Sequence, residues 1–193
     1  THAPEGPEVP VGAGSFPIQI LAHPTLPVAY VASTGYAQRA VLVVDAATGA
    51  VVQEVDRSDA FFGLALSPDG HTLYAAGGAA SKVDVYAIDA TTGQLTAGTP
   101  IALDAYPAGL AVSDDGTKLW VAQFRGPTIT EVALPAGTAG RTVTPSLRPY
   151  DLLYLPARHE LWASGFADTR IAVIDVTTMT ETTAIDAGGG NPV

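Results

Sequence analysis

Residues 61–77 read FFGLALSPDGHTLYAAG, and residues 107–123 read PAGLAVSDDGTKLWVAQ. Each stretch has an apolar run, a turn sequence that ends in Asp-Gly, and a second apolar run. This order is typical of a β-hairpin, because glycine adopts the positive φ that a tight turn requires. The two stretches therefore predict two equivalent hairpins in different parts of the chain.

The same pattern occurs four times along the chain, which makes an internal repeat the first feature to interpret. Ile20, Leu64, Leu110 and Leu152 align at intervals of 42 to 46 residues. A second landmark follows in each copy, at Tyr30, Tyr74, Trp120 and Trp162. A third comes after it, as VLVVDAATG (41–49), VDVYAIDATTG (83–93), ITEVALPAG (129–137) and IAVIDVTTM (171–179). Each copy therefore predicts four antiparallel strands.

Four such sheets predict an all-β fold, a β-propeller built of four-stranded antiparallel blades. A sheet with two apolar faces must bury both of them, and radial stacking of blades does so. The predicted boundaries are an N-terminal extension at 1–8, the last strand of a preceding or closing blade at 9–15, blade 1 at 16–58, blade 2 at 59–104, blade 3 at 105–147, blade 4 at 148–188, and the start of a further blade at 189–193.

Both ends of the repeat region resemble parts of further blades, and an exposed sheet edge is a liability that propellers remove by closing the ring. We therefore expect the four blades to be part of a seven- or eight-bladed ring. A second propeller segment, a protein partner or a second copy in a homodimer would complete it. A self-contained four-bladed ring is the alternative.

Composition narrows the possible partners. The chain has 9 Lys and Arg residues against 19 Asp and Glu residues, a formal charge of -10. Such a field repels phosphate backbones and anionic membranes, so neither nucleic acid nor membrane insertion is expected. The apolar runs are also shorter than the roughly 20 residues of a spanning helix. Cysteine is absent, which excludes disulfides and thiolate metal sites in these residues.

The repeat resembles that of the YVTN family of β-propellers, on the stretches FFGLALSPDGHTLYAAG, VDVYAIDATTG and PAGLAVSDDGTKLWVAQ. The second and third copies match best, while the first has His23 to Pro27 in place of the Asp-Gly turn. The resemblance implies a propeller of usually seven blades in an exported bacterial or archaeal protein, so we expect a periplasmic or extracellular location. More distant resemblances are to lactonase-type propellers and to the large subunit of amine dehydrogenases, a platform for another subunit.

Known catalytic motifs do not occur in the chain: it has no G-x-S-x-G elbow, no H-E-x-x-H and no phosphate-binding glycine loop. Neither a catalytic residue nor a metal ligand is assigned, and no cofactor is expected. Aspartates in the hairpins are interpreted as turn formers, since the side chain of Asp can bond to the backbone of the following turn. They are Asp45, Asp69, Asp89, Asp114, Asp115 and Asp175.

Residues that depart from the repeat at the mouth of the ring are the candidate contact residues, because a repeat scaffold needs only its consensus. Gln19 and Asp151 replace glycines of the other copies on the innermost strand, which would point polar groups toward the central channel. Arg125 and Arg148 could bind a carboxylate, with Asp151 holding one of them in place. The full set of candidates is Arg125, Arg148, Asp151, Gln19, Tyr106, Asp59, Phe124 and Asp168.

These features favour a non-catalytic exported propeller that acts as a binding or assembly platform for another protein or domain. A lactonase-type hydrolase is the first alternative, and it would need a bound metal or a cluster of perturbed carboxylates, for which Asp59, Asp151 and Asp168 are scattered candidates. An electron-transfer platform subunit is the second alternative. The sequence does not decide whether the chain is an enzyme, and it favours a protein without catalytic activity.

Overall fold

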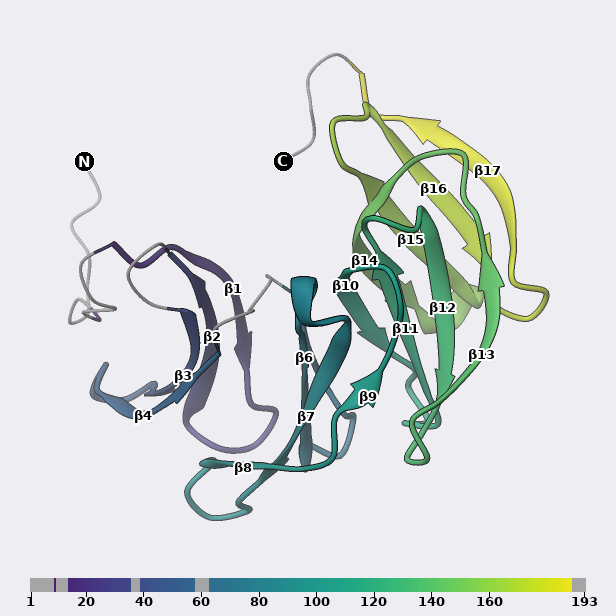
Figure 1. Cartoon of the computed structure of the whole chain (residues 1–193). Helices are drawn as coiled ribbons and strands as arrows, with labels where there is room; N and C mark the ends of the chain where they lie inside the picture. The colour runs from purple at the N-terminus through teal and green to yellow at the C-terminus, as the bar shows by residue number, and fades with distance from the viewer. Residues whose placement is uncertain (1–8, 10–13, 36–38, 58–62, 189–193) are drawn as a thin grey trace.

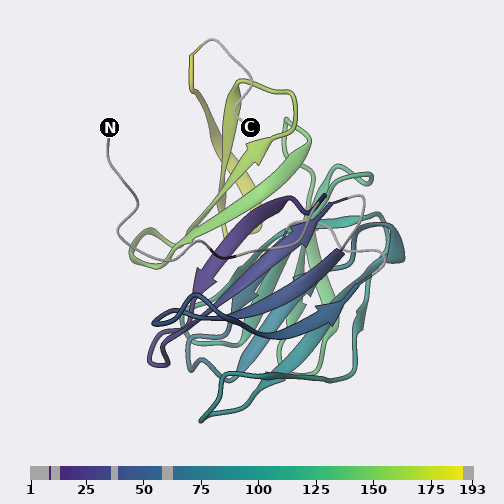
Figure 2. The same ribbon diagram turned by 90° about the vertical axis from the view of Figure 1, so that its left-hand side faces the viewer.

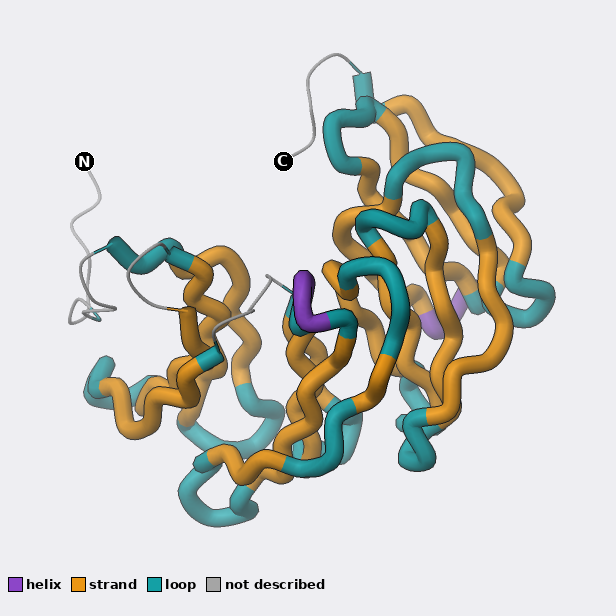
Figure 3. The backbone as a smooth tube through the Cα atoms, viewed as in Figure 1, coloured by secondary structure: helices purple, strands orange, loops and turns teal. Residues whose placement is uncertain are grey.

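A computed structural model of the chain describes residues 9, 14–35, 39–57 and 63–188. It is all-β apart from two single-turn 3₁₀ helices, η1 at Gly78–Ala80 and η2 at Pro156–Arg158 (Figure 3). Four antiparallel sheets follow one another along the chain (Figure 1). The prediction of an all-β propeller with four four-stranded blades is confirmed, while the larger ring stays a proposal.

Each blade is a meander in which consecutive strands pair. Blade 1 contains β1 (Pro17–Ala22), β2 (Val28–Thr34), β3 (Arg39–Asp45) and β4 (Val51–Asp56). Blade 2 contains β5 (Leu64–Leu66), β6 (Thr72–Ala76), β7 (Lys82–Ile88), and a split outer strand, β8 (Leu95–Ala97) and β9 (Ile101–Ala102). Blade 3 contains β10 (Pro107–Val112), β11 (Lys118–Gln123), β12 (Thr128–Ala133) and β13 (Thr138–Val143). Blade 4 contains β14 (Pro149–Leu155), β15 (Glu160–Gly165), β16 (Arg170–Asp175) and β17 (Thr180–Asp186).

The segments predicted at both ends fall largely outside the described residues. Of the stretch 9–15, only Val9, Gly14 and Ser15 are described, and none of the three lies in a strand. The stretch 189–193 lies outside the described residues altogether.

The hairpin turns form as the sequence predicts. Asp45 Oδ1 accepts hydrogen bonds from the backbone N–H groups of Ala47 and Thr48, at 2.9 and 2.8 Å. Asp89 and Asp175 make the same contacts in blades 2 and 4. Each of these bonds favours the carboxylate, so it lowers the pKa of the aspartate. These aspartates are therefore turn formers, as expected.

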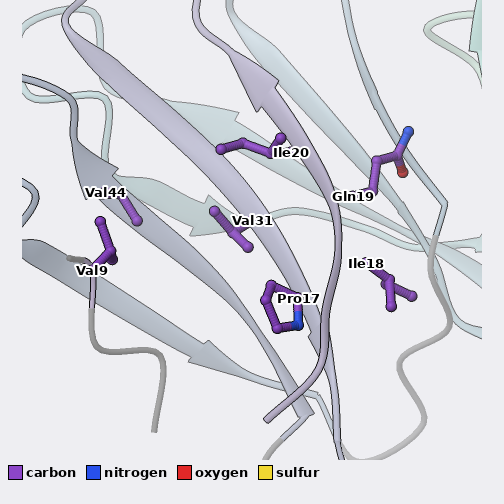
Figure 4. A pocket seen from close by; sticks show the side chains of 7 residues that line it. All are labelled: Val9, Pro17, Ile18, Gln19, Ile20, Val31 and Val44. Atoms are coloured by element: carbon purple, nitrogen blue, oxygen red, sulfur yellow. The ribbon is translucent and has the colours of Figure 1, made fainter. Parts of the chain in front are cut away.

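Three hydrophobic clusters join the four blades in series. Cluster 1-2 lies between blades 1 and 2 around Tyr30, cluster 2-3 lies between blades 2 and 3 around Tyr74, and cluster 3-4 lies between blades 3 and 4 around Trp120. The views in Figures 1 and 2 agree that blades 1 and 4 stand at the two ends of the series. Most of the core of the described residues therefore lies in three sheet-on-sheet interfaces. A fourth, smaller cluster of aliphatic side chains lies on the other face of blade 1, with Val9 packed against it (Figure 4), and consists of Val31, Ala40, Leu42 and Val44.

The innermost strands approach so closely that side chains would not fit between them. A Cβ placed on Gly63 would lie 1.8 Å from the carbonyl oxygen of Ala108, and one on Gly109 would lie 2.5 Å from the Cα of Asp151. Both neighbours are backbone atoms, which cannot move aside cheaply. Glycine at these positions is what lets blades 2, 3 and 4 converge on the axis.

Candidate binding surface at the propeller mouth

The mouth loops of blades 3 and 4 are held in pairs by backbone hydrogen bonds. In blade 3, Phe124 in the loop between the second and third strands donates its N–H to the carbonyl of Tyr106, at 3.0 Å. In blade 4, the N–H of Phe166 donates to the carbonyl of Arg148, at 2.9 Å. The loop before each blade is therefore fixed to a loop within the same blade, and their side chains project together.

Three aromatic rings from these loops and the ring of Tyr150, on β14, make one continuous cluster. Phe124 lies at its centre, with ring centroids 6.0 Å from Tyr106, 6.0 Å from Tyr150 and 4.9 Å from Phe166. Tyr150 and Phe166 also contact each other at 5.4 Å. The geometries are tilted or edge-to-face, which the ring quadrupole favours. The cluster joins blade 3 to blade 4 at the mouth.

Two arginines stack on these rings. The guanidinium carbon of Arg125 lies 4.8 Å from the ring centroid of Tyr106, and that of Arg148 lies 5.4 Å from the ring of Phe124. Both distances fall in the range of cation–π attraction. We call the four rings and the two arginines the mouth patch. Its residues are Tyr106, Phe124, Arg125, Arg148, Tyr150 and Phe166.

Within the described residues, the arginines of the mouth patch have no carboxylate partner. Six other cationic side chains do have one, namely Arg57, Lys82, Lys118, Arg141, Arg158 and Arg170. In a chain with 19 acidic residues and 9 basic ones, acidic partners are plentiful. Arg125 and Arg148 therefore differ from these six side chains: within the described residues they contact aromatic rings in place of a carboxylate.

Tyr106 holds a backbone conformation that few large residues adopt, with φ at 64°. A non-glycine residue in this left-handed region is strained, and such strain clusters at functional sites. The conformation turns the chain just before β10, so that the Tyr106 ring lies beneath Arg125. The residue with the strained backbone, Tyr106, is therefore the one whose ring stacks against Arg125.

Asp151 does not hold either arginine, contrary to expectation. Its carboxylate Oδ1 accepts a hydrogen bond from the N–H of the next residue, Leu152, at 2.9 Å. Burial raises the pKa of this carboxyl, and no nearby cation offsets the effect. Because Asp151 lies on β14 beside Tyr150, its charge also contributes to the raised pKa of the Tyr150 phenol, which burial raises most.

Gln19 is engaged with the neighbouring blade rather than with an open channel. Its side-chain Nε2 donates to the carbonyl of Leu64 at 3.3 Å, and its Oε1 accepts from the Leu64 N–H at 2.5 Å. Gln53 makes the same pair of bonds to Leu95 at the outer edge. Both glutamines therefore fasten blade 1 to blade 2.

Asp168 and Asp59 complete the set of candidates. Asp168 pairs with Arg170 at 2.9 Å and accepts a bond from the Arg170 N–H at 3.0 Å. These bonds lower the pKa of the Asp168 carboxyl, with the Arg170 side chain as the largest cause. Asp168 is therefore tied to its own loop, and Asp59 lies outside the described residues.

The structure adds Tyr150 to the residues that sequence reasoning selected. Tyr150 lies directly after Pro149 at the start of β14, and it was not among the predicted contact residues. Its contacts with Phe124 and Phe166 come from tertiary packing alone. An aromatic residue directly after this proline was the available signal.

In the described residues, no three His, Cys, Asp or Glu side chains come together as ligands for a metal ion. In the same residues, no helix has the length and apolar character to cross a membrane.

Comparison with known proteins places the chain in a family. Residues 28–154 match the family model described as the SMP-30/Gluconolactonase/LRE-like region. This match covers more than half of the chain, which therefore belongs to the SMP-30/gluconolactonase/LRE-like family of β-propellers. The expected membership of the YVTN family remains a resemblance of the repeats. Among curated proteins, no sequence matches this chain.

Solved structures show the same architecture. A luciferin-regenerating enzyme is 21% identical, with 81% of this chain and 55% of that chain covered, and a TM-score of 0.69. Hydrazine synthase of Kuenenia stuttgartiensis is 22% identical over 74% of this chain and 40% of its own, with a TM-score of 0.61. The RRP9 WD40 repeats are 12% identical over 90% and 55%, with a TM-score of 0.69. At these identities the likeness concerns the fold, and this chain spans roughly half the length of each structure.

Proposed function

We propose that the chain is a binding platform whose mouth patch contacts acidic side chains of a partner protein. One observation carries the proposal. In a chain of net charge -10, two arginines without a carboxylate partner among the described residues stack on a cluster of four rings. An acidic group of a partner would supply the missing counter-charge.

The composition of the mouth patch supports a protein partner. Aromatic residues and arginine are enriched in protein interfaces, and they dominate binding hot spots. A guanidinium that stacks by its flat face keeps its in-plane N–H donors available at the edge, where they match a carboxylate. Phe166 is 46% exposed, so the patch also offers apolar area to the partner.

The proposal extends to the role and location of the protein. The chain would act without catalysis of its own, as a platform for another protein or domain. A periplasmic or extracellular location is part of the proposal, and its support is the resemblance of the repeats to exported propellers.

Peptide binding tests the proposal directly. The labelled chain would be titrated with a blocked Glu-Tyr-Glu-Phe-Glu peptide and with its Gln-Tyr-Gln-Phe-Gln counterpart, and backbone amide shifts would be followed by NMR. We expect shifts at Phe124, Arg125 and Phe166 with the acidic peptide, and much weaker ones with the neutral peptide. The double variant Arg125→Gln/Arg148→Gln should lose the response.

Arg158→Gln is the matched control, because Arg158 is an exposed arginine that pairs with Glu160 in the η2 turn. This variant should bind the acidic peptide as the wild type does. Equal binding of both peptides, or binding that survives the double variant, would refute the proposal.

A lactonase-type hydrolase is the second candidate, and family membership with the half-buried Asp151 favours it. A carboxylate with a raised pKa can act as a general base. It would take a proton from water as the water oxygen attacks the lactone carbonyl. The ring C–O bond would then break, and the proton would pass to the departing alkoxide, giving a hydroxy acid.

The hydrolysis of glucono-δ-lactone tests this candidate. Its rate would be measured from the release of acid in a weakly buffered solution with a pH indicator. Asp151→Asn should abolish any rate above the spontaneous one, while Asp168→Asn should keep it. A wild-type rate equal to the spontaneous rate removes the candidate and leaves the binding platform untouched.

A further inference from the structure

Two grooves lie where the end of one blade's outer strand meets the second, third and fourth strands of the next blade. Groove 1-2, between blades 1 and 2, has a volume of about 390 Å³, and groove 2-3, between blades 2 and 3, has one of about 370 Å³. The two are equivalent in the repeat, since Gly77 lies opposite Lys82 as Gln123 lies opposite Thr128. Differences between their side chains therefore decide what each groove can bind.

The charged groups at the base of groove 1-2 are bonded to one another. Asp84 on β7 pairs with Arg57 at 2.8 Å and with Lys82 at 2.9 Å. A ligand that bonded to these groups would have to compete with an ion pair that is largely buried. The side chains of groove 1-2 therefore serve the contact between the blades.

In blade 4, side chains already occupy the equivalent place. Strand register aligns Ala172 with Thr130 of blade 3, which removes the polar group, and Gly165 with Gln123. A Cβ on Gly165 would lie 2.6 Å from the Cβ of Asp168 and 3.4 Å from that of Leu147. The loop side chains of blade 4 therefore take up the space that Gln123 borders in blade 3.

Groove 2-3 keeps free hydrogen-bonding capacity at its base. Thr130 stands where Asp84 stands in blade 2, and Gln123 stands where Gly77 does. Gln123 is 6% exposed and Thr130 is 3% exposed, and Gln123 Nε2 donates to Thr130 Oγ1. This leaves Gln123 Oε1 without a partner among the described residues. It is open to the groove, because the unpartnered side-chain atoms that are sealed from solvent in these residues are Ser33 Oγ, Arg57 Nη1 and Trp120 Nε1.

The walls of groove 2-3 add hydroxyl groups and little charge. Thr128 on β12 and Thr142 on β13 line it, and neither hydroxyl makes a hydrogen bond among the described residues. Asp104 is the charged side chain of the described lining. Most of the other lining residues are alanine or glycine, such as Gly126 and Gly140, which leave room for a ring between the polar groups.

We propose that groove 2-3 binds a small uncharged ligand with several hydroxyl groups on a ring, of the size and chemistry of a monosaccharide. Hydroxyl and amide groups donate and accept hydrogen bonds, as the hydroxyls of a sugar do. The Asp104 carboxylate accepts bonds from further ligand hydroxyls, and its charge in a chain of net charge -10 disfavours an anion. The volume of about 370 Å³ lies within the usual range of ligand sites.

This site is separate from the mouth patch, although one loop borders both. Phe124 and Arg125 belong to the mouth patch, while Gly126 lines groove 2-3. The N–H of Arg125 donates to the carbonyl of Ala105 at 3.2 Å, which fixes this loop to the segment that forms the opposite wall of the groove. The groove is therefore formed by described residues at 102–142 of two adjacent blades.

Sugar binding tests the proposal. The isotope-labelled chain would be titrated, to tens of millimolar, with the methyl glycosides of glucose, galactose and mannose, and amide shifts would be followed by NMR. We expect saturable shifts at Gly126, Gly140 and the side-chain amide of Gln123 with at least one of the three. The uronic acid of the same sugar should bind several-fold more weakly, because Asp104 repels its carboxylate.

The double variant Thr128→Val/Thr142→Val removes two hydroxyls and keeps the shape of both side chains. Its affinity for the sugar should fall roughly tenfold, because two hydrogen bonds are lost. Thr138→Val is the matched control, since Thr138 is an exposed threonine on the same outer strand and does not line the groove. This variant should bind as the wild type does.

Three outcomes overturn the proposal: no saturable shift with any of the three glycosides, binding that the double threonine variant leaves unchanged, and a uronic acid that binds as tightly as its neutral sugar. Arg125→Gln/Arg148→Gln should keep the sugar response and lose only the peptide response. Loss of the sugar response in that variant would place the sugar at the mouth patch and also overturn the proposal. Failure of groove 2-3 and failure of the mouth patch are therefore distinguishable.

Discussion

The ion pair between Arg57 and Asp84 clamps blade 1 to blade 2, and its two halves should differ in how much stability they carry. Arg57 follows β4 with a side chain 4% exposed, and Asp84 lies on β7 with one 16% exposed. Arg57 donates from Nε and Nη2 to Asp84 Oδ2, at 3.0 and 2.8 Å. Lys82 contacts the other carboxylate oxygen at 2.9 Å.

The cost of removing one partner depends on whether the charge that remains still has a counter-charge. Asp84→Asn strands the buried Arg57 cation, and breaking a buried pair in this way costs about 3 to 5 kcal/mol. Arg57→Met keeps most of the apolar volume, and Lys82 still neutralises Asp84. The loss is then mainly of hydrogen bonds, including those to the carbonyls of Ala75 and Ala76, at about 1 to 2 kcal/mol.

Urea unfolding followed by circular dichroism measures both changes in the free energy of unfolding. We expect Asp84→Asn to cost more than Arg57→Met, with little dependence on salt because a buried pair is poorly screened. Arg158→Gln removes an exposed arginine and should leave the midpoint unchanged. A larger loss for Arg57→Met, or equal losses for both, would refute the role assigned to Lys82.

Three further predictions concern turns, blade spacing and a buried phenol. Hydrogen bonds from Ser113 and Thr117 lower the pKa of Asp115 to about 2, so its contribution to stability is present above its ordinary value of 3.8 and is lost as the pH falls toward 2; Asp115→Asn should flatten acid unfolding in that range. Gly109→Ala should lower the free energy of unfolding by about 1 to 3 kcal/mol, the usual cost of overpacking, because its Cβ would meet backbone atoms. Gly140→Ala, whose Cβ would make only an ordinary contact at 3.5 Å, should be almost neutral in the same urea experiment. The buried Tyr30 phenol, whose pKa burial raises to about 12, donates to the Gly93 carbonyl at 2.9 Å, and Tyr30→Phe should lower the free energy of unfolding by about 1 kcal/mol. An unchanged unfolding midpoint in Tyr30→Phe would show that this bond adds nothing net.

Most of the fold follows from the sequence because the information is local and is repeated four times. The Asp-Gly turns, the strand lengths and the aspartates that hold the turns depend on residues close to one another along the chain. Asp45 needs only Ala47 and Thr48 to form its turn. The four-bladed architecture then follows from the need of each sheet to bury two faces.

The candidate site depends on residues that lie far apart in the sequence. The sequence indicated Tyr106, Phe124, Arg125 and Arg148 as mouth residues, but it did not show that they stack, and it missed Tyr150. It suggested that Asp151 would hold an arginine, whereas in the structure its half-buried carboxylate accepts a hydrogen bond from the N–H of Leu152. Only the packing of blade 3 against blade 4 sets which loop side chains meet.

The sequence by itself thus determined the repeat, the strands, the turns and the class of fold, since short-range hydrogen bonding and alternation of side chains encode them. The tertiary structure decided which polar groups are paired across blades, as for Gln19 with Leu64 and Arg57 with Asp84. It also decided that Ile20 and Leu153 are largely exposed, at 67% and 58%. The physical reason is that contacts between sheets depend on how the blades pack in space, and no local pattern of residues specifies that packing.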